Sequence, residues 1–546
     1  MGNSKLCNLQ NKKKMNSKKL IILLIAPLAY FFLGSYILQI AGFFSLHGAD
    51  PECIYFISGL SVANGKLMLG HIDNPGTPLQ YMAALVFRLV YFLRSHQVSF
   101  NLDVLANFDM YLHVLNLALT SVIAVFMYFA GRIFYRISNN LTYTVLLQLS
   151  PLFTSIIFLN IGRVVPENLI PIPVMLLSIL LLQPLFASDD NRFRNNYLWF
   201  GLISAFGLSI KLTYFPLWII PLIVLTTWKE RIRYSLIAVG SFFVMALPVT
   251  LQINVFWGWM KALFLHSGQY GKGEGNIIDW KTFGPNFSSL YTENRFFFWI
   301  MIVLLIVFVA SFISKKNREG SLVRRISLAV LSATVIQTVI VCKQYEARYF
   351  IPALMLLPVS ILIIAEFIRQ FNPVISKYRI PQIAIVLIIS VYFVRQLPVV
   401  QHLSQDMDQK INQKAQAMHY MQTIEKDAVK IIVTTNYGAP VQEYVLMHSY
   451  EWSGRQRDFF KPVLAELYPN SYIFFPWDNT MHFWAKEPDF KNPDRPTYIY
   501  FLNDNLKESF LQNAGKYFPE KYELIRTFFN EGNGEVVYKL AKAASE

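Results

Sequence analysis

The feature that most constrains the fold is a series of long apolar segments separated by short polar ones. A membrane-spanning helix needs roughly 20 mostly apolar residues. Only 15% of the residues are charged, whereas a soluble domain averages about 25%. We therefore predict an α-helical polytopic membrane protein with about eleven transmembrane helices. The candidate segments are 20–41, 108–130, 142–159, 167–187, 197–210, 212–228, 235–253, 296–314, 326–342, 349–368 and 381–398.

The basic residues predict the orientation of these segments. If the N-terminus is cytoplasmic, every basic cluster falls in a cytoplasmic loop, as the positive-inside rule requires. This placement accounts for the net charge of +15 without a nucleic-acid partner. The first apolar segment is too long for a cleavable signal peptide and indicates a signal anchor. The clusters are Lys12–Lys14 with Lys18 and Lys19, Arg132 and Arg136, Arg192 and Arg194, Lys229 with Arg231 and Arg233, 315–325, and Arg369 with Lys377 and Arg379.

An odd number of spans places six other regions together on the outer face. The first of them, 42–107, contains Ile54–Ala63 and Leu79–Leu93, which we predict to be amphipathic helices on the membrane surface. The loop 254–295 contains the glycine-rich GQYGKGEG, beginning at Gly268, and is predicted to be mobile. The remaining outer regions are the turn 160–166, the turn at Lys211, the turn 343–348 and the tail from 399.

The tail from 399 to 546 has the composition of a soluble domain. Lys430–Thr435, Ser471–Phe475 and Thr497–Phe501 predict strands, and Asn505–Ala514 predicts a helix, so we expect a small α/β domain. The predicted organisation is a cytoplasmic segment 1–19, a membrane domain 20–398 and this C-terminal domain. Three cysteines exclude a disulfide framework. Free cysteines are the ordinary case, and a single Cys53–Cys342 bridge is the alternative.

Ionisable residues recur at the outer ends of the predicted spans. Charges beside a membrane are costly and therefore indicate function. A carboxylate at this interface can accept a proton from an attacking hydroxyl, and cations can stabilise a departing phosphate. The set predicts a reaction between an anionic lipid and a neutral nucleophile. Its members are Asp50, Glu52, Asp73, Arg163, Glu167, Lys211, Lys343, Glu346 and Arg348.

Several short motifs resemble those of a known superfamily. The first outer loop is similar to that of GT-C polyprenyl-phosphate-dependent glycosyltransferases, closest to the branch of protein O-mannosyltransferase-like enzymes and the lipid A aminoarabinose transferase. The likeness covers about residues 20–400. Two positions depart from the pattern: Pro51 splits the acidic pair, and Asn74 replaces a His or Lys, for which Lys66 or His71 could substitute. The motifs are Asp50–Pro51–Glu52, Tyr55, Asn64–Gly65, Asp73–Pro78, Arg163–Glu167 (RVVPE), Gly207–Lys211 (GLSIK) and Arg348–Pro352 (RYFIP).

The resemblance implies a GT-C fold and an inverting transfer of a sugar from a polyprenyl-phosphate donor to a hydroxyl acceptor. It implies Asp50 as the base, with Glu52 as its rival. It implies no cofactor. The alternative is a divalent-metal site formed by Asp50, Glu52 and Glu167, like the metal site of some distant relatives. The location implied is a bacterial inner membrane, with the first loop and the C-terminal domain outside the cytoplasm. Donor phosphate is assigned to Lys211, Arg348, Arg163 and Lys343, and acceptor or sugar to Asp73, Glu167, Tyr55, Glu346 and Tyr349.

Structural roles are the alternative for each of these residues. Asp50 or Glu52 could cap a helix, Arg163 and Glu167 could form a local ion pair, and Lys211 could extend its ammonium to the interface. At the level of function, a transporter or flippase of lipid-linked saccharides is the main competitor. Transporters tend to place polar groups near the midplane and to show inverted repeats, neither of which the sequence has. A polysaccharide ligase or polymerase would share the lipid donor but not this first loop.

Overall fold

The computed structural model describes most of the chain. The described residues are 16–46, 50–94, 97–153, 155–186, 196–267, 271–273, 275–312, 317–371, 378–435, 439, 441–491, 495–518 and 521–542. Several sequence predictions fall outside them and are not tested: those for Lys12–Lys14, Arg192, Arg194, Lys315, Lys377 and Gly268.

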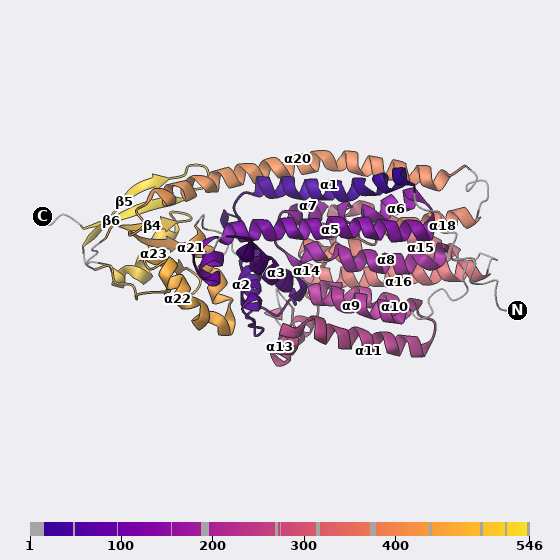
Figure 1. Cartoon of the computed structure of the whole chain (residues 1–546), viewed down its shortest axis with the longest axis horizontal. Coiled ribbons are helices and arrows are strands. Elements are labelled where there is room, and N and C mark those ends of the chain that lie inside the picture. Colours follow the sequence, from indigo (N-terminus) through magenta and orange to yellow (C-terminus); the bar gives the residue numbers. More distant parts are fainter. Residues whose placement is uncertain are drawn as a thin grey trace.

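Long apolar helices form the body of the molecule (Figure 1). Within the described residues, six helices are long and apolar enough to cross a membrane. A seventh span results if α14 (Trp280–Glu293) and α15 (Arg295–Ala310), which are bent by 92°, count as one. The predicted number of eleven is not confirmed. The six are α1 (Ser17–Ala41), α5 (Phe108–Ser138), η4 with α8 (Pro166–Phe186), most of α16 (Asn317–Lys343), η7 through α18 (Ala347–Gln370), and α20 (Ile380–Thr423).

The other predicted spans are divided into shorter helices, and prolines account for several of the breaks. Pro151 lies between α6 and α7, Pro216 lies in the 3-10 turn before α10, and Pro248 opens α12. α11 begins at a capping box formed by Thr227 and Glu230. The bounds are α6 Leu141–Gln148, η3 Ser150–Leu152, α7 Ser155–Ile161, α9 Tyr197–Ile210, η5 Leu212–Trp218, α10 Ile219–Val224, α11 Trp228–Met245, α12 Leu247–Thr250, α13 Ile253–Leu265, α17 Ile351–Leu354 and α18 Leu357–Phe371.

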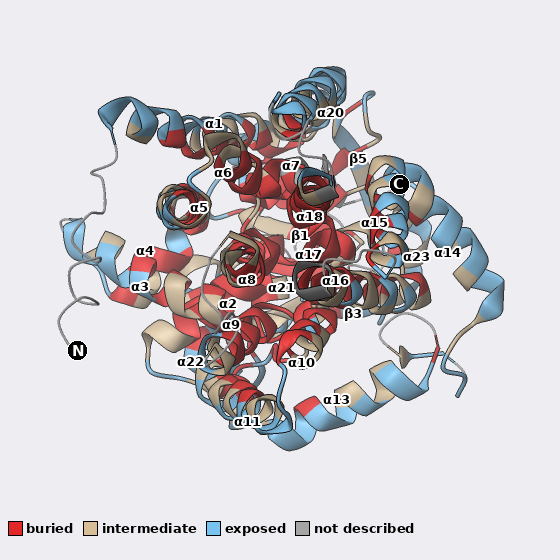
Figure 2. Cartoon of the chain, turned by 90° about the vertical axis from the view of Figure 1, so that its right-hand side faces the viewer, coloured by how far each residue is buried: buried red, intermediate tan, exposed pale blue. Residues whose placement is uncertain are grey.

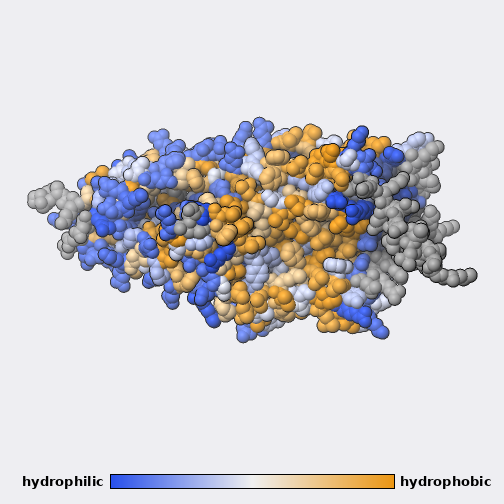
Figure 3. All heavy atoms as spheres, viewed as in Figure 1, coloured by the Kyte–Doolittle hydropathy of each residue, from blue (hydrophilic) through white to orange (hydrophobic). Residues whose placement is uncertain are grey.

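The surface of the helical body is apolar where a membrane would contact it. Viewed end-on, buried residues gather around α8, α16 and α18, and exposed residues lie on outer helices such as α20 (Figure 2). The outward side chains of α1 and α20 include Ile21, Ile25, Val386 and Leu387. Figure 3 shows hydrophobic surface as a broad band over the helices and hydrophilic surface over the C-terminal sheet. An apolar surface this extensive is expected of a protein in contact with lipid.

The first outer loop forms three α-helices, and the burial of one of them overturns a prediction. Almost every residue of α2 (Glu52–Ala63) is buried, so the prediction that Ile54–Ala63 lies on the membrane surface is wrong. The reason is that α3 and α21 both pack against it. In contrast, α3 (Thr77–Leu93) is amphipathic and exposes Leu85, Leu89 and Phe92, as a surface helix would. η2 (Phe44–Leu46) precedes α2, and α4 (Phe100–Ala106) follows α3.

The C-terminal region is built on a six-stranded sheet with strand order β3-β2-β1-β4-β6-β5. The three predicted strands are confirmed as β1 (Val429–Val433), β2 (Ser471–Phe475) and β4 (Thr497–Phe501), which pair in parallel. The predicted helix is confirmed as α23 (Leu506–Ala514). The other elements were not predicted: β3 (Thr480–Phe483), β5 (Tyr522–Phe529), β6 (Val536–Lys542), α21 (Gln442–Glu451), α22 (Arg457–Leu467), η8 (Gly454–Gln456) and η9 (Gly515–Tyr517).

One helix joins the body to this sheet. α20 continues from its apolar half through Pro398 to Thr423, so the predicted domain boundary at 398–399 falls within a helix (Figure 1). The C-terminal region packs directly on the first loop: the Gln442 amide donates to Leu105 O at 2.9 Å, and the Gln456 amide donates to Met68 O at 3.3 Å. The outer loop and the C-terminal region thus meet at one end of the helices.

We predict that Gly70→Ala loosens this junction. A Cβ at Gly70 would lie 2.1 Å from Trp452 O and 2.6 Å from Gly454 N, and backbone atoms can yield only if the two parts separate. Overpacking of this kind costs about 1–3 kcal/mol, so the detergent-solubilised variant should unfold at a lower temperature than the parent. Gly240→Ala is the matched control, because nothing lies within 4 Å of a Cβ there. Equal stability of the two variants would contradict the packing.

Candidate functional site

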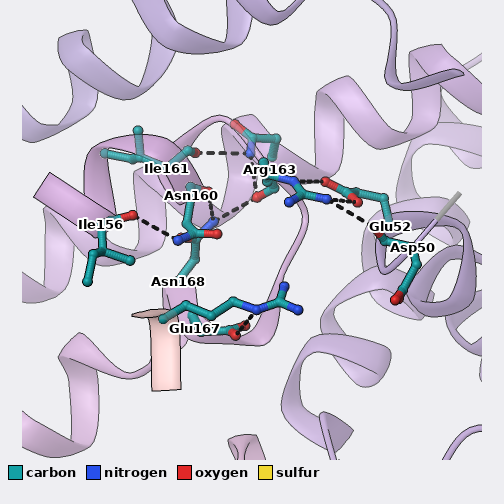
Figure 4. Close-up of polar contacts among 10 residues, drawn as sticks. Asp50, Glu52, Ile156, Asn160, Ile161, Arg163, Glu167 and Asn168 are labelled. Carbon is teal, nitrogen blue, oxygen red and sulfur yellow. Dashed lines mark hydrogen bonds and ion pairs between the residues drawn. The ribbon is translucent and has the colours of Figure 1, made fainter. Parts of the chain in front are cut away.

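A turn between α7 and α8 carries two of the predicted residues and is shaped by asparagines. The Asn168 amide donates to Asn160 O at 2.9 Å and to Arg163 O at 2.7 Å. The Asn116 amide, from α5, donates to Ile161 O at 3.1 Å and to Arg163 O at 3.0 Å (Figure 4). Carbonyls at a helix end lack partners within the helix, and these amides supply them. The turn is therefore fixed, and its side chains have set directions.

Sequence reasoning missed these asparagines because a search for charged residues passes over amides. Asn116 offered one usable signal: it is a polar side chain in the middle of an otherwise apolar predicted span. Such residues usually bond to a neighbouring helix or backbone.

Arg163 forms a bidentate ion pair with Glu52 (Figure 4). Its Nε lies 2.5 Å from Glu52 Oε1, and its Nη2 lies 2.7 Å from Glu52 Oε2 and 3.1 Å from Asp50 O. Glu52 is 1% exposed, so both of its oxygens are held away from water. The alternative of a local Arg163–Glu167 ion pair is therefore wrong, since each residue bonds elsewhere.

The two acids that flank Pro51 differ in their surroundings. The Asp50 carboxylate points away from Arg163 (Figure 4), and the residue is exposed. Within the described part of the chain, this carboxylate makes no hydrogen bond or ion pair. A carboxylate engaged by an arginine is a poor proton acceptor, because protonation would break the pair. The geometry therefore favours Asp50 over Glu52 as a base.

A second cluster joins Glu167, Lys211 and Arg348. The Lys211 ammonium bonds to Glu167, and both residues are buried. Arg348 Nε lies 3.5 Å from Glu167 Oε1 and 3.6 Å from Glu346 Oε1, which is too far for a strong hydrogen bond. Both cations lie near the Tyr349 ring, with Lys211 Nζ at 4.9 Å from its centroid and Arg348 Cζ at 5.9 Å. Arg348 is thus the cation with donors left to offer an anion.

The central part of the first loop places Tyr55, His71 and Asp73 together. His71 Nδ1 lies 2.8 Å from Asp73 Oδ1, and the His71 ring contacts the Tyr55 ring edge-on at 5.6 Å. Tyr55 packs under Gly76, whose φ of 57° and whose closeness to the Tyr55 ring exclude a side chain there. Burial raises the pKa of the Tyr55 phenol well above its usual 10, so it remains protonated. Burial also opposes ionisation of Asp73, but His71 outweighs it and lowers the pKa of that carboxyl.

The proposed substitutes for the missing cation at Asn74 do not join the cluster. His71 is occupied by Asp73. Lys66 lies over the Phe459 ring of the C-terminal region, 5.5 Å from its centroid. Lys343 supplies a cation near Asn74 instead, because both residues line the same cavity.

This cavity, here called the apolar cavity, has a volume of about 370 Å³. Its walls are mostly aliphatic and aromatic, and its polar residues include Asn74, Lys343 and Tyr349. Lys343 Nζ donates to Leu263 O and Phe264 O, both at 2.8 Å, which are carbonyls at the end of α13. No carboxylate within the described residues pairs with Lys343, so its charge is held but not neutralised.

A second space, here called the polar cleft, lies between the first loop and the C-terminal region. Its volume is about 430 Å³. Most of its walls come from residues after 440, which sequence reasoning did not assign to the site. The lining residues are Asp50, Ile54, Lys272, His448, Glu451, Trp452, Phe475, Trp477, Asp478 and His482.

The structure also tests the alternatives of a metal site and of a disulfide bridge. Among the residues that the structure describes, no three His, Cys, Asp or Glu side chains are grouped so as to hold a metal ion. Cys53 and Cys342 are both buried and neither is in a disulfide, so the alternative of a bridge between them is wrong.

Comparison with known proteins gives a likeness in fold. No protein-family model matches the sequence, and neither does any curated protein. Two crystal structures of ArnT from Cupriavidus metallidurans are similar. The one bound to undecaprenyl phosphate has a TM-score of 0.48 and 10% identity over 94% of this chain and 97% of that one. The apo structure has a TM-score of 0.47 and 13% identity over 94% and 98%.

ArnT is the lipid A aminoarabinose transferase, a GT-C enzyme.

The Glu52–Arg163 pair generates a stability prediction. Arg163→Met should destabilise the protein by about 3–5 kcal/mol, because it leaves a buried carboxylate without a partner. Glu52→Leu should likewise leave Arg163 unpaired, whereas the double variant should recover most of the loss. Denaturant unfolding of the four proteins in detergent, arranged as a double-mutant cycle, measures the coupling. Additive losses in the double variant would show that the pair is not coupled.

Proposed function

We propose that this protein is an integral membrane glycosyltransferase that transfers a sugar from a polyprenyl-phosphate donor to a hydroxyl acceptor. The observation that carries the proposal is the arrangement of charge. An exposed Asp50 carboxylate, without a bonded partner among the described residues, lines a polar cleft. Lys343 lines an apolar cavity, and Arg348 lies beside Tyr349, which lines the same cavity. Asp50 is close enough to Arg348 for the two charges to interact. A carboxylate and cations on either side of one reacting centre suit the departure of a phosphate.

The apolar cavity suits the first part of an isoprenoid chain. Its walls include Trp257, Phe256 and Leu208, and Lys343 lies among them. The Arg348 guanidinium is the better candidate for the phosphate itself, since arginine binds phosphate in a bidentate manner. Glu167 and Lys211 are buried and bonded to each other, and Arg348 lies 3.5 Å from the same Glu167 oxygen, so we assign them to holding Arg348 in place. Tyr349 links the apolar cavity to the cluster of Glu167, Lys211 and Arg348, because it lines the cavity and its ring lies near Lys211 and Arg348.

The proposed chemistry is a single displacement. The Asp50 carboxylate accepts the proton of the acceptor hydroxyl while that oxygen forms a bond to the anomeric carbon of the donor. The bond from this carbon to the phosphate oxygen breaks, and polyprenyl phosphate leaves with the electron pair. Arg348 and Lys343 stabilise the charge that develops on the phosphate. One in-line displacement inverts the anomeric centre, so no covalent enzyme intermediate is required.

The proposed location is a bacterial inner membrane, with the site on the outer face and the N-terminus in the cytoplasm. The basic residues Arg136, Lys229 and Arg369 support it, because they lie at or near those helix ends that are opposite the site. Acceptor or sugar contacts are assigned to Asp73, Tyr55 and Glu346, of which Glu346 is the most accessible, with a side chain 48% exposed.

The first functional prediction concerns the base. Asp50→Asn should lower the rate of sugar transfer by about 100- to 10,000-fold, because the amide cannot accept the proton. The assay follows release of undecaprenyl phosphate from a panel of labelled undecaprenyl-phosphate hexoses and pentoses, using purified protein. Asp406→Asn, an exposed carboxylate on α20, is the control and should leave the rate unchanged. Full activity of Asp50→Asn would exclude the base assignment. Movement of the lipid across liposomes without cleavage would favour the flippase instead.

The second functional prediction concerns the phosphate. Arg348→Gln should weaken binding of undecaprenyl phosphate by about 10- to 100-fold, since a hydrogen bond to a charged group is worth about 1.5–3 kcal/mol. Lys229→Gln removes a cation at the opposite end of the helices and should have little effect. Quenching of intrinsic tryptophan fluorescence by the lipid gives the affinities. If the two variants weaken binding equally, the phosphate does not lie at Arg348.

A further inference from the structure

The wall of the polar cleft opposite the first loop presents aromatic surface to solvent. The Trp477 ring stacks on Phe475 with centroids 4.1 Å apart and planes at 22°. Trp477 is nevertheless 49% exposed, and Trp452, which also lines the cleft, is 40% exposed. Phe475 thus supports one face of the Trp477 ring, while about half of the side chain stays accessible to a ligand. An exposed aromatic in a concave, partly polar site is typical of a binding surface.

Hydrogen-bonding groups surround these rings in a fixed arrangement. His482 Nδ1 lies 3.1 Å from Glu451 Oε1, and His482 Nε2 lies 3.1 Å from Asp478 Oδ2. The backbone N–H of Thr480 donates to Asp478 Oδ1 at 3.0 Å, and Arg457 Nη2 lies 2.6 Å from Glu451 Oε2. Each carboxylate oxygen has lone pairs beyond those used here. The cleft therefore presents oriented acceptors beside an aromatic face.

The charge balance of the cleft limits the ligand. Burial lowers the pKa of the His482 imidazole, but Glu451 and Asp478 outweigh it and raise that pKa above the usual 6.5. With His482 protonated, the carboxylates of Asp50, Glu451 and Asp478 are matched by three cations, namely His482, Lys272 and the Arg457 that pairs with Glu451. The cleft therefore has no surplus of positive charge to attract a phosphate or other anion, whereas hydroxyl groups find acceptors.

We propose that the polar cleft binds a neutral saccharide, which is the acceptor of the transferred sugar. A pyranose ring has an apolar face of C–H groups that suits the face of Trp477, and its hydroxyls can donate to Asp478 and Glu451. Asp50 lines the same cleft, so one hydroxyl of the bound sugar lies within reach of the proposed base. The role as acceptor rests on the proposed function, whereas the binding of a neutral saccharide does not.

The test measures binding of the full-length protein in detergent to a glycan array. The array carries neutral mono- to tetrasaccharides of hexoses, N-acetylhexosamines and pentoses, with phosphorylated forms of the same sugars. We expect retention on neutral sugars, and a loss of about tenfold in affinity for Trp477→Ala. Trp477→Phe should recover most of the binding. Asp478→Asn should weaken it without changing the unfolding temperature. Trp228→Ala is the control, because Trp228 is exposed at the start of α11 and lines neither the apolar cavity nor the polar cleft, and it should bind saccharides normally.

The outcomes separate this inference from the proposed function. Binding that is confined to phosphorylated sugars, absent altogether or unchanged in Trp477→Ala would overturn the inference. Donor cleavage is measured on the same samples with the undecaprenyl-phosphate sugars. Cleavage without saccharide binding supports the proposed function and excludes this site, whereas saccharide binding without any cleavage leaves the site and removes its role as the acceptor site.

Discussion

The buried ion pair between Glu52 and Arg163 is the interaction on which the rest of the site depends. It joins the start of α2 to the turn before α8, two segments 111 residues apart in sequence. Asn116 and Asn168 bond the Arg163 carbonyl and so fix the backbone from which the guanidinium reaches Glu52. The same guanidinium donates to the backbone of Asp50 and so fixes the position of that residue. One arginine thereby neutralises the Glu52 carboxylate and holds the backbone of Asp50 in place.

This arrangement assigns different tasks to charges that look alike in the sequence. Lys211 and Glu167 neutralise each other in a buried setting, where an unpaired charge would be costly. Arg348 lies at the margin of that pair, and Lys343 is held by neutral carbonyls, so both keep positive potential to offer an anion. The structure thus separates charges that hold the site together from charges that can act on a ligand.

The sequence predicted those parts of the fold that depend on composition and local pattern. Six of the apolar segments are helices long enough to span a membrane, and the strands rich in Ile, Phe and Tyr form where the pattern indicates. It failed where tertiary packing decides. α2 looks like a surface helix until α3 and α21 cover it. The charged residues of the site were found because charge near a membrane is conspicuous. The tail residues of the polar cleft have no such signal, and Asn116 offers only the weaker one of a polar side chain within an apolar span.

The C-terminal region therefore has more than a packing role. It buries α2 and contacts the loop that carries Asp50, with Gly70 against Gly454 and His71 against Trp452 at 5.7 Å. It also contributes most of the walls of the polar cleft, which Asp50 lines from the first loop. In the proposed reaction, the donor binds at Arg348, Lys343 and the apolar cavity, and the acceptor binds in the polar cleft. The first loop lies between them, and its buried α2 is the rigid element that keeps the proposed base at their boundary.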